Sequence, residues 1–254
     1  MCKKVNGMNK SKEVYNVVCL KWGTKYPADY VNRLFNMVNR NTTIEYNFYC
    51  ITDNAEGLDD GIEAKIITDL SLVGWWYKLM IFKEDFYGIS GISIFLDLDV
   101  VITSNIDDLF TVDPGKFKII RDLKEGFNSS VFRLSMGSMP HVWNDFVESK
   151  EDIIKRLHGD QDWIAESAPD HMSTWPAEWV VSYKKQCNAR AERSYGRIGE
   201  WARKHSLLAP PKGKAKLPVG TKIVIFHGKP DPEDVQDGPW GMWKHAPWIN
   251  ENWH

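Results

Sequence analysis

The stretch GISIFLDLDVVI, residues 91–102, combines a strand-like apolar run with two aspartates, Asp97 and Asp99. Residues i and i+2 of a strand point to the same side, so the two carboxylates are expected to face together. Burying one unpaired carboxylate costs several kcal/mol, and two neighbouring carboxylates also repel each other. A divalent cation such as Mg²⁺ or Mn²⁺ would neutralise both, because these ions prefer oxygen ligands. The alternative is a pair of structural acids at a strand end, one capping a turn and one solvated.

The composition is that of an ordinary globular protein of 254 residues, with 43% hydrophobic residues, 26% charged residues and a net charge of −2. This balanced charge gives no reason to expect a nucleic-acid partner. The N-terminal segment is polar, and no run approaches the ~18 apolar residues of a membrane span. The four cysteines lack CxxC spacing, which argues against a zinc site and is typical of buried thiols in a reducing compartment. We therefore expect a soluble, cytoplasmic protein, with Cys19 and Cys50 inside buried strands.

Strands alternate with helices along the first half of the chain. This order predicts an α/β fold with a largely parallel central sheet flanked by helices. Ligands of such sheets bind beyond the carboxyl ends of the strands, which is where the two aspartates stand. In the first helix Tyr30, Leu34, Met37 and Val38 fall at helical spacing and should be buried. The expected strands are 14–20, 44–51, 62–67 and 91–99, and the expected helices are 28–38 and 74–86.

The second half is less regular, and part of it is strongly basic. Residues 117–122 and 127–134 read as strands and residues 140–157 as a helix. Residues 184–222 carry eleven Lys or Arg against two acids, and the Pro, Gly and Lys of residues 209–220 predict a mobile loop. The basic run fits a solvated face, a lid over a diphosphate, or a dock for an anionic acceptor or a membrane surface.

Four short motifs occur in the order found in one enzyme family. FLDLDVVI (95–102) resembles the metal-binding DxD strand of nucleotide-sugar-dependent glycosyltransferases of the GT-A fold. FNSSVFRL (127–134) resembles the NSGVMLL-type segment of glycosyltransferase family eight, the group of glycogenin and the lipopolysaccharide galactosyltransferases. HGDQDWI (158–164) resembles that family's DQD segment, and FHGKPDP (226–232) resembles a shortened form of its C-terminal HGxxKPW segment. The resemblance covers residues 14–232.

This resemblance implies one GT-A-like domain over residues 1–254, with a Rossmann-like, mostly parallel sheet. Residues 14–110 would form the nucleotide-binding half, residues 111–232 the half that binds donor sugar and acceptor, and residues 233–254 a Trp-rich tail. The implied activity moves a sugar from a nucleotide-diphosphate sugar, with UDP favoured over GDP, to an unknown acceptor with retention at the anomeric carbon. Its cofactor would be Mn²⁺ or Mg²⁺, which stabilises a leaving diphosphate as a Lewis acid.

The resemblance also assigns roles to individual residues. The metal ligands would be Asp97, Asp99 and His227. The catalytic residues would be Asp160, which bonds a sugar hydroxyl, and Gln161, which lies near the anomeric carbon. The donor sugar or the acceptor would contact Asn128, Ser129 and Ser130. The nucleotide would be bound by Gly23, Thr24, Tyr26, Asp53, Lys78, Gly228 and Lys229, with Tyr26 against the base.

Two other functions compete with this interpretation. A phosphatase of the haloacid-dehalogenase type also has an apolar strand that ends in DxD, with one aspartate as nucleophile. In that family the strand comes first in the domain and is followed by Gly-Thr, whereas here strand-like runs precede it and Val100-Val101 follow. A non-catalytic module that binds a sugar nucleotide or a glycan would keep the fold without turnover. Two departures from family eight are Ser130, where a glycine is usual, and HGKP, which lacks the two residues between HG and KP.

Overall fold

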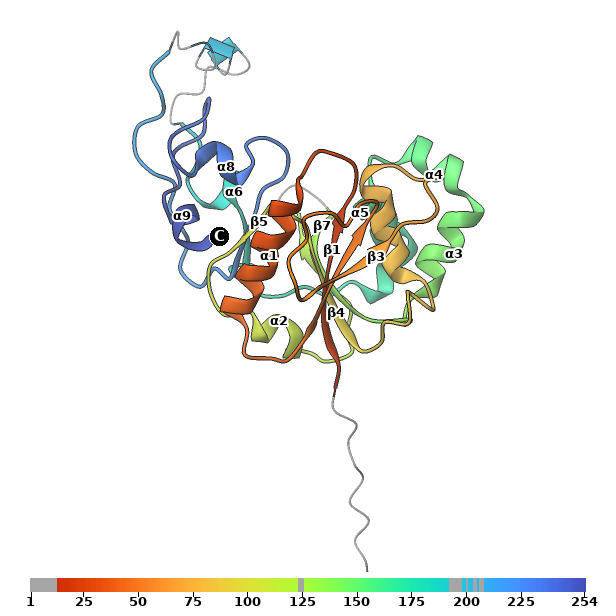
Figure 1. Ribbon diagram of the computed structural model, residues 1–254. Helices are drawn as coiled ribbons and strands as arrows, with labels where there is room; N and C mark the ends of the chain where they lie inside the picture. The colour runs from red at the N-terminus through yellow and green to blue at the C-terminus, as the bar shows by residue number, and fades with distance from the viewer. Residues whose placement is uncertain (1–12, 123–125, 192–197, 200, 203–204, 206–207) are drawn as a thin grey trace, which may run out of the picture.

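A six-stranded sheet, ordered β3-β2-β1-β4-β7-β6, forms the central layer of the computed structural model (Figure 1). The pairings of β1 with β2, β2 with β3 and β1 with β4 are parallel, whereas β7 runs antiparallel to both β4 and β6. The predicted α/β fold with a mostly parallel sheet is therefore confirmed. The structure describes residues 13–122, 126–191, 198–199, 201–202, 205 and 208–254. The strands of the sheet are β1 Tyr15–Lys21, β2 Asn47–Thr52, β3 Ile62–Ile66, β4 Ile92–Leu96, β6 Lys118–Arg121 and β7 Phe127–Ser135.

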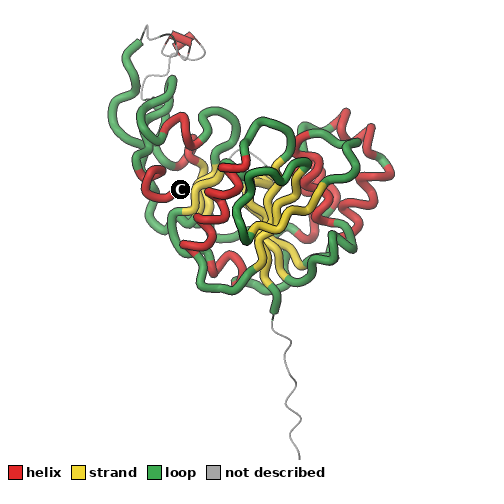
Figure 2. Tube along the Cα trace, viewed as in Figure 1, coloured by secondary structure: helices red, strands yellow, loops and turns green. Residues whose placement is uncertain are grey.

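Helices cover both faces of this sheet, as Figure 2 shows. Successive side chains of β1 point to opposite faces, so Val17 belongs to the core under α1 and Val18 to the core under the 3₁₀ helix η1. The stripe predicted for the first helix is confirmed, because α1 buries all four of the residues at helical spacing. The helical elements are α1 Ala28–Asn41, η1 Gly74–Phe82, α2 Asp107–Thr111, α3 Pro140–Glu148, α4 Lys150–Arg156, α5 Asp160–Ser167, η2 Pro169–His171, α6 Tyr183–Gln186, α8 Pro232–Val235 and α9 Trp248–Asn252.

A second, three-stranded sheet begins where β4 ends. It has the order β5-β9-β8, formed by Val100–Ile102, Ile223–Ile225 and Val180–Ser182. The strand expected over residues 91–99 stops at Leu96, and the chain turns through Asp97–Asp99 into β5. Backbone hydrogen bonds fix both ends of this turn: the Asp97 N–H donates to the Ser130 carbonyl at 2.9 Å and the Phe226 N–H donates to the Asp99 carbonyl at 3.2 Å. The acidic pair therefore joins two sheets and does not continue one strand.

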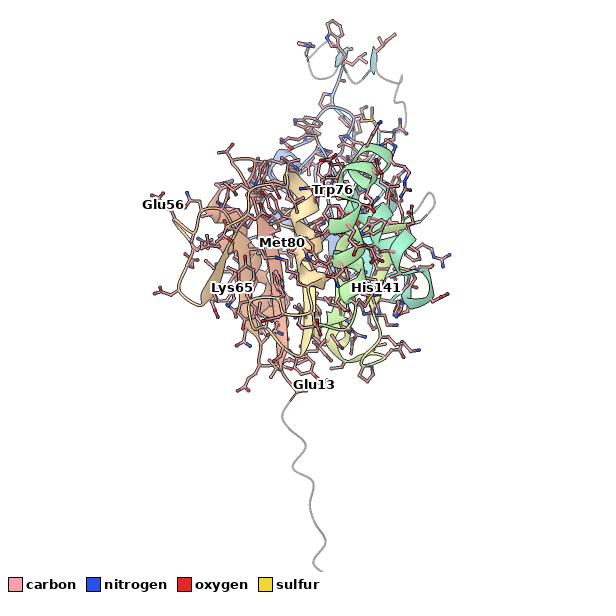
Figure 3. All side chains as sticks on the ribbon, turned by 90° about the vertical axis from the view of Figure 1, so that its right-hand side faces the viewer. Glu13, Glu56, Lys65, Trp76, Met80 and His141 are labelled. Atoms are coloured by element: carbon pink, nitrogen blue, oxygen red, sulfur yellow. The ribbon has the colours of Figure 1, made fainter. Side chains whose placement is uncertain are left out.

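The segment expected to be an amphipathic α-helix over residues 74–86 is instead the 3₁₀ helix η1, Gly74–Phe82. All seven residues from Trp76 to Phe82 are buried, so the segment has no polar face of the kind that an amphipathic helix requires. Figure 3 shows η1, with Trp76 and Met80 labelled, beside α3, which carries His141. This burial places the charged Lys78 inside the protein, where it needs partners.

One expectation for the second half is corrected by backbone geometry. The helix expected over residues 140–157 is split into α3 and α4 at Ser149, whose φ of −122° lies outside the helical range. Residues 209–220 form a loop, as expected, with a single bridging residue at Lys214, and the mobility of this loop stays a prediction. There the Ala215 N–H donates to the His245 carbonyl, the Lys216 N–H donates to the Cys187 carbonyl, and Ala215 is buried. Part of the basic run, residues 192–197, 200, 203–204 and 206–207, lies outside the described residues.

The Trp-rich tail packs against α1. Trp248 and Trp253 are buried, and the Arg33 guanidinium lies 4.3 Å from the Trp253 ring. Arg40 donates hydrogen bonds to the carbonyls of Asn252 and His254 at 2.7 and 2.6 Å. The tail is thus part of the same folded unit as the sheet.

Two further expectations concern the cysteines and membrane-spanning segments. Cys19, Cys50 and Cys187 are buried and unpaired, as expected for small hydrophobic side chains, while Cys2 lies outside the described residues. Among the helices of the described residues, none combines the length and the apolar character that a membrane crossing requires.

Asp107 fastens the start of α2 to the residues that follow α1. Its carboxylate accepts hydrogen bonds from the hydroxyls of Thr42 and Thr43 at 2.5 and 2.6 Å, and from Asn105 at 3.1 Å. Burial opposes ionisation of this carboxyl, but the hydrogen bonds outweigh burial and lower its pKa to about 2. The ionised form is therefore favoured in the folded state.

We predict that Asp107→Asn lowers the free energy of unfolding at pH 7 by about 1–2 kcal/mol, because the variant loses charge-assisted hydrogen bonds. A depressed pKa stabilises the fold above the unfolded-state value near 4, and this stabilisation is lost as the pH falls towards 2. Urea unfolding at pH 7, 4 and 2.5 should therefore show a difference between wild type and variant that shrinks with acid. An equal difference at all three values would contradict the assignment.

Candidate active site

A cleft of about 790 Å³ opens where β1 and β4 end. Because β7 runs antiparallel to β4, its first residues lie at this same edge of the sheet, and α5 begins there with Asp160. The residues after β9 close the cleft from the side of the second sheet. Most of the predicted site residues line it: Thr24, Tyr26, Lys78, Asp97, Asp99, Asn128, Ser129, Ser130, Asp160, Gln161, His227 and Gly228.

Lys78 is the central charge of the cleft. It is 4% exposed, and its Nζ lies 2.9 Å from Asp97 Oδ1 and 3.6 Å from Asp160 Oδ2. It also donates to the Ser129 hydroxyl at 3.2 Å, and that hydroxyl donates to Asp160 at 2.6 Å. Burial alone would lower the Lys78 pKa, but Asp160 and Asp97 outweigh burial and raise it. The ammonium therefore stays charged and joins η1 to β4, β7 and α5.

Asp99 belongs to a second acidic group, on the other side of the turn. The Tyr26 hydroxyl lies 2.9 Å from Asp99 and 3.3 Å from Asp231, which are 8% and 4% exposed. Burial, followed by the nearby charge of Asp97, raises the Asp99 pKa to about 7. One hydroxyl proton serves only one acceptor at a time, so the shorter contact, to Asp99, is the better hydrogen bond. Asp231 is paired with the Lys229 ammonium at 3.0 Å, whereas no ion pair to Asp99 is found among the described residues.

His227 is the third residue predicted to bind the metal. Its Nε2 lies 2.8 Å from the Ser182 hydroxyl, and its carbonyl accepts a hydrogen bond from Lys184 at 2.6 Å. Burial and then the charge of Lys184 lower the His227 pKa, so the ring is neutral at physiological pH, as a metal ligand must be. Across the described part of the chain, however, no three His, Cys, Asp or Glu side chains form a metal-binding group. The structure thus places His227 in the cleft without assembling the predicted trio.

The loop after β1 forms one wall of the cleft. Gly23 has φ 63°, a left-handed conformation that favours glycine, and its N–H donates to Asp53 at 3.0 Å. Asp53 therefore holds the loop from outside the set of lining residues, and Gly23 is not in that set either. The Tyr26 ring packs 4.6 Å from the Tyr30 ring and lies beneath the Lys25 ammonium at 4.3 Å. The placement of a base against Tyr26 stays a prediction.

Several residues depart from what the sequence indicated. Lys229 does not line the cleft, because its Nζ pairs with Asp231 at 3.0 Å and Asp234 at 2.9 Å. Asp231 itself was missed, although it lies in the shortened HGKPD segment that was noted as unusual. Ser182 was also missed, since no sequence pattern connects it with His227, 45 residues away. Asn128 accepts the Ser130 N–H at 2.9 Å, which orients the start of β7.

Comparison with known proteins identifies the fold. No family model and no curated protein matches the chain. Solved structures are similar to it. One is the galactosyltransferase LgtC, crystallised with donor and acceptor sugar analogs. Its TM-score is 0.57 at 14% sequence identity, and the match covers 85% of this chain and 88% of LgtC. GlyE of Streptococcus pneumoniae, a glycosyltransferase, has a TM-score of 0.57 at 13% identity, covering 87% of this chain and 56% of its own.

A third similar structure is that of the bifunctional glycosyltransferase WbbM, with a TM-score of 0.61 at 10% identity. It covers 97% of this chain and 50% of WbbM, so this chain spans about half the length of WbbM and of GlyE. The three β-strands that precede β4 also count against the phosphatase interpretation, in which the DxD strand comes first. These likenesses, together with the mixed sheet and the cleft at its edge, show that the chain has the GT-A fold of glycosyltransferases.

Proposed function

We propose that this chain is a glycosyltransferase that uses a nucleotide-diphosphate sugar, with UDP-sugar favoured, and a divalent metal. A fold alone does not determine an activity, so the proposal depends on the site. The observation that carries it is the cleft at the carboxyl ends of β1 and β4, which Asp99 lines together with Lys78 and the two carboxylates that Lys78 contacts, Asp97 and Asp160. Carboxylates and one buried ammonium at this position suit a metal-bound diphosphate with a sugar attached.

The donor set fits a hard divalent cation. Asp97 and Asp99 supply carboxylate oxygens, which Mn²⁺ and Mg²⁺ prefer. Lys78 contacts Asp97 and Asp160 but not Asp99, whose buried carboxyl shares a hydroxyl with another acid, Asp231. Asp97 and Asp99 would hold the metal, and His227, whose Nε2 now lies 2.8 Å from the Ser182 hydroxyl, would be the third ligand. The bound metal would supply Lewis-acid stabilisation of the leaving diphosphate.

The chain's own residues would position the donor. Lys78 holds Asp160 and Asp97 in fixed relation, so a sugar hydroxyl bonded by Asp160 would lie close to the metal site. The Ser129 hydroxyl keeps Asp160 oriented, and Gln161 follows it in the first turn of α5, on the wall of the cleft. Tyr26 and Thr24 also line the cleft, and the nucleoside is expected beside them. In this arrangement transfer proceeds with retention, which the family resemblance favours.

The direct test is a screen of UDP, GDP and their sugars with and without Mn²⁺. A ligand at about one hundred times its Kd stabilises by about 2.7 kcal/mol, which raises the Tm of a protein of this size by about 5–10 °C. We expect that rise for a UDP-sugar only with metal, together with slow release of UDP. Binding without release of UDP or transfer would indicate the non-catalytic module. Release of inorganic phosphate from phosphate esters, without nucleotide binding, would indicate the phosphatase.

We predict that Asp99→Asn weakens UDP binding in the presence of Mn²⁺ by at least about 100-fold, because the metal loses a charged ligand. Asparagine keeps a side-chain oxygen that can accept the hydrogen bond from the Tyr26 hydroxyl, so the fold should be retained. Isothermal titration with Mn²⁺ and with EDTA separates metal-dependent from metal-independent affinity, and Asp97→Asn should behave alike. Asp60→Asn, an exposed acid on the turn before β3, is the matched control. Unchanged Mn²⁺ dependence in both site variants would overturn the DxD assignment.

We predict that Asp160→Asn lowers kcat by at least about 100-fold while the Kd for UDP changes less than about threefold. The reason is that Asp160 serves the sugar, whereas Lys78 keeps Asp97 as its partner at 2.9 Å. Turnover and UDP titration on the same preparation give both values, and the Tm shows whether the variant is folded. Loss of UDP affinity in parallel with turnover would argue against this division between sugar and nucleotide.

A further inference from the structure

A second pocket, of about 370 Å³, adjoins the cleft and shares Asn128 and His227 with it. Its floor is apolar, formed by the buried side chains of Ile120, Val180 and Ile225. The two shared residues make the pocket continuous with the proposed donor site. A molecule seated in it would therefore meet the donor near the end of β9.

The apolar floor of this second pocket includes an aromatic ring. Trp175 lines it and is 5% exposed. Its indole N–H has no hydrogen-bond partner among the described residues, although buried donors are nearly always paired. Trp175 packs in the same hydrophobic cluster as Ile120, Val180 and Ile225, so it belongs to the apolar floor of the pocket. Asn128 and Gln186 add amide groups to the lining.

The rim of the second pocket is basic. Arg121, at the end of β6, and Lys185, in α6, both line the pocket and are exposed. The structure gives neither side chain an ion pair within the described part of the chain. Asp122 is the single acid among the lining residues. Lys184 adds a further positive charge beside the pocket, since its Nζ donates to the His227 carbonyl at 2.6 Å.

We propose that this second pocket is the acceptor site and that it selects a saccharide carrying an anionic group, a carboxylate or a phosphate. The inference rests on the proposed function, because it takes the adjoining cleft as the donor site. The apolar floor, to which Trp175 contributes an edge, would face the sugar ring, and the amides of Asn128 and Gln186 would provide partners for its hydroxyls. Arg121 and Lys185 bind the anion, with the planar guanidinium suited to two oxygens at once. The acceptor hydroxyl is thereby brought towards His227 and the donor.

The test measures direct binding to the whole chain, without turnover. The probes are glucuronate and glucose 6-phosphate, with glucose as the neutral control and inorganic phosphate as the control without a sugar, each titrated in the presence of UDP and Mn²⁺. We expect both anionic sugars to bind about tenfold more tightly than glucose, the range of charge-assisted hydrogen bonds, and more tightly than inorganic phosphate. This preference should weaken as salt is raised.

Two double variants test which residues cause the preference for anionic sugars. Arg121→Gln combined with Lys185→Gln should abolish the preference for anionic sugars, while UDP with Mn²⁺ binds as in wild type. Lys116→Gln combined with Lys155→Gln removes the same charge from exposed positions outside the pocket and should leave the preference intact. Equal binding of glucose and the anionic sugars, equal binding of inorganic phosphate, or a preference that survives in the first double variant would each overturn the proposal. Failure of UDP to bind wild type would instead overturn the proposed function.

Discussion

The buried ammonium of Lys78 is the interaction on which the rest of the site depends. It joins four elements that are distant in sequence, because its partners lie at the end of β4, the start of β7 and the first residue of α5. Removing one partner of a buried ion pair costs about 3–5 kcal/mol, since the other charge is left uncompensated. The buried 3₁₀ helix η1 is the scaffold that presents this charge. These elements converge on one cation at the edge of the cleft.

Local sequence patterns were sufficient for the elements whose burial is regular. The first helix has an apolar stripe at period 3.6, β1 and β2 are short and mostly apolar, and β3 alternates apolar with charged residues. The same patterns failed for η1, because a segment buried on all sides has no periodicity that distinguishes helix types. The sequence patterns also failed to predict the end of β4 at Leu96. Apolar residues on both sides of two acids look like one continuous strand, although here they belong to two different sheets.

The site was predictable to the extent that its residues lie in motifs. The DxD, NSS and DQD segments lead directly to the groups around Lys78, and the structure places them in one cleft. Residues whose role depends on long-range contacts could not be found in this way. Asp231 meets Tyr26 across 205 positions and Ser182 meets His227 across 45, while Arg121 and Lys185 line one pocket only because the fold brings them to it. No spacing in the chain encodes such neighbours.

The turn from Asp97 to Asp99 determines how the two sheets are coupled. Asp97 is hydrogen-bonded to the strand β7 of the large sheet, and Asp99 to the segment after β9 of the small one, so the two carboxylates belong to different bodies of hydrogen-bonded chain. An ion that binds both carboxylates would therefore link the large sheet to the small sheet. By thermodynamic linkage, a change that destabilises the small sheet would lower the affinity for the ion, and the bound ion would in turn stabilise the junction between the two sheets.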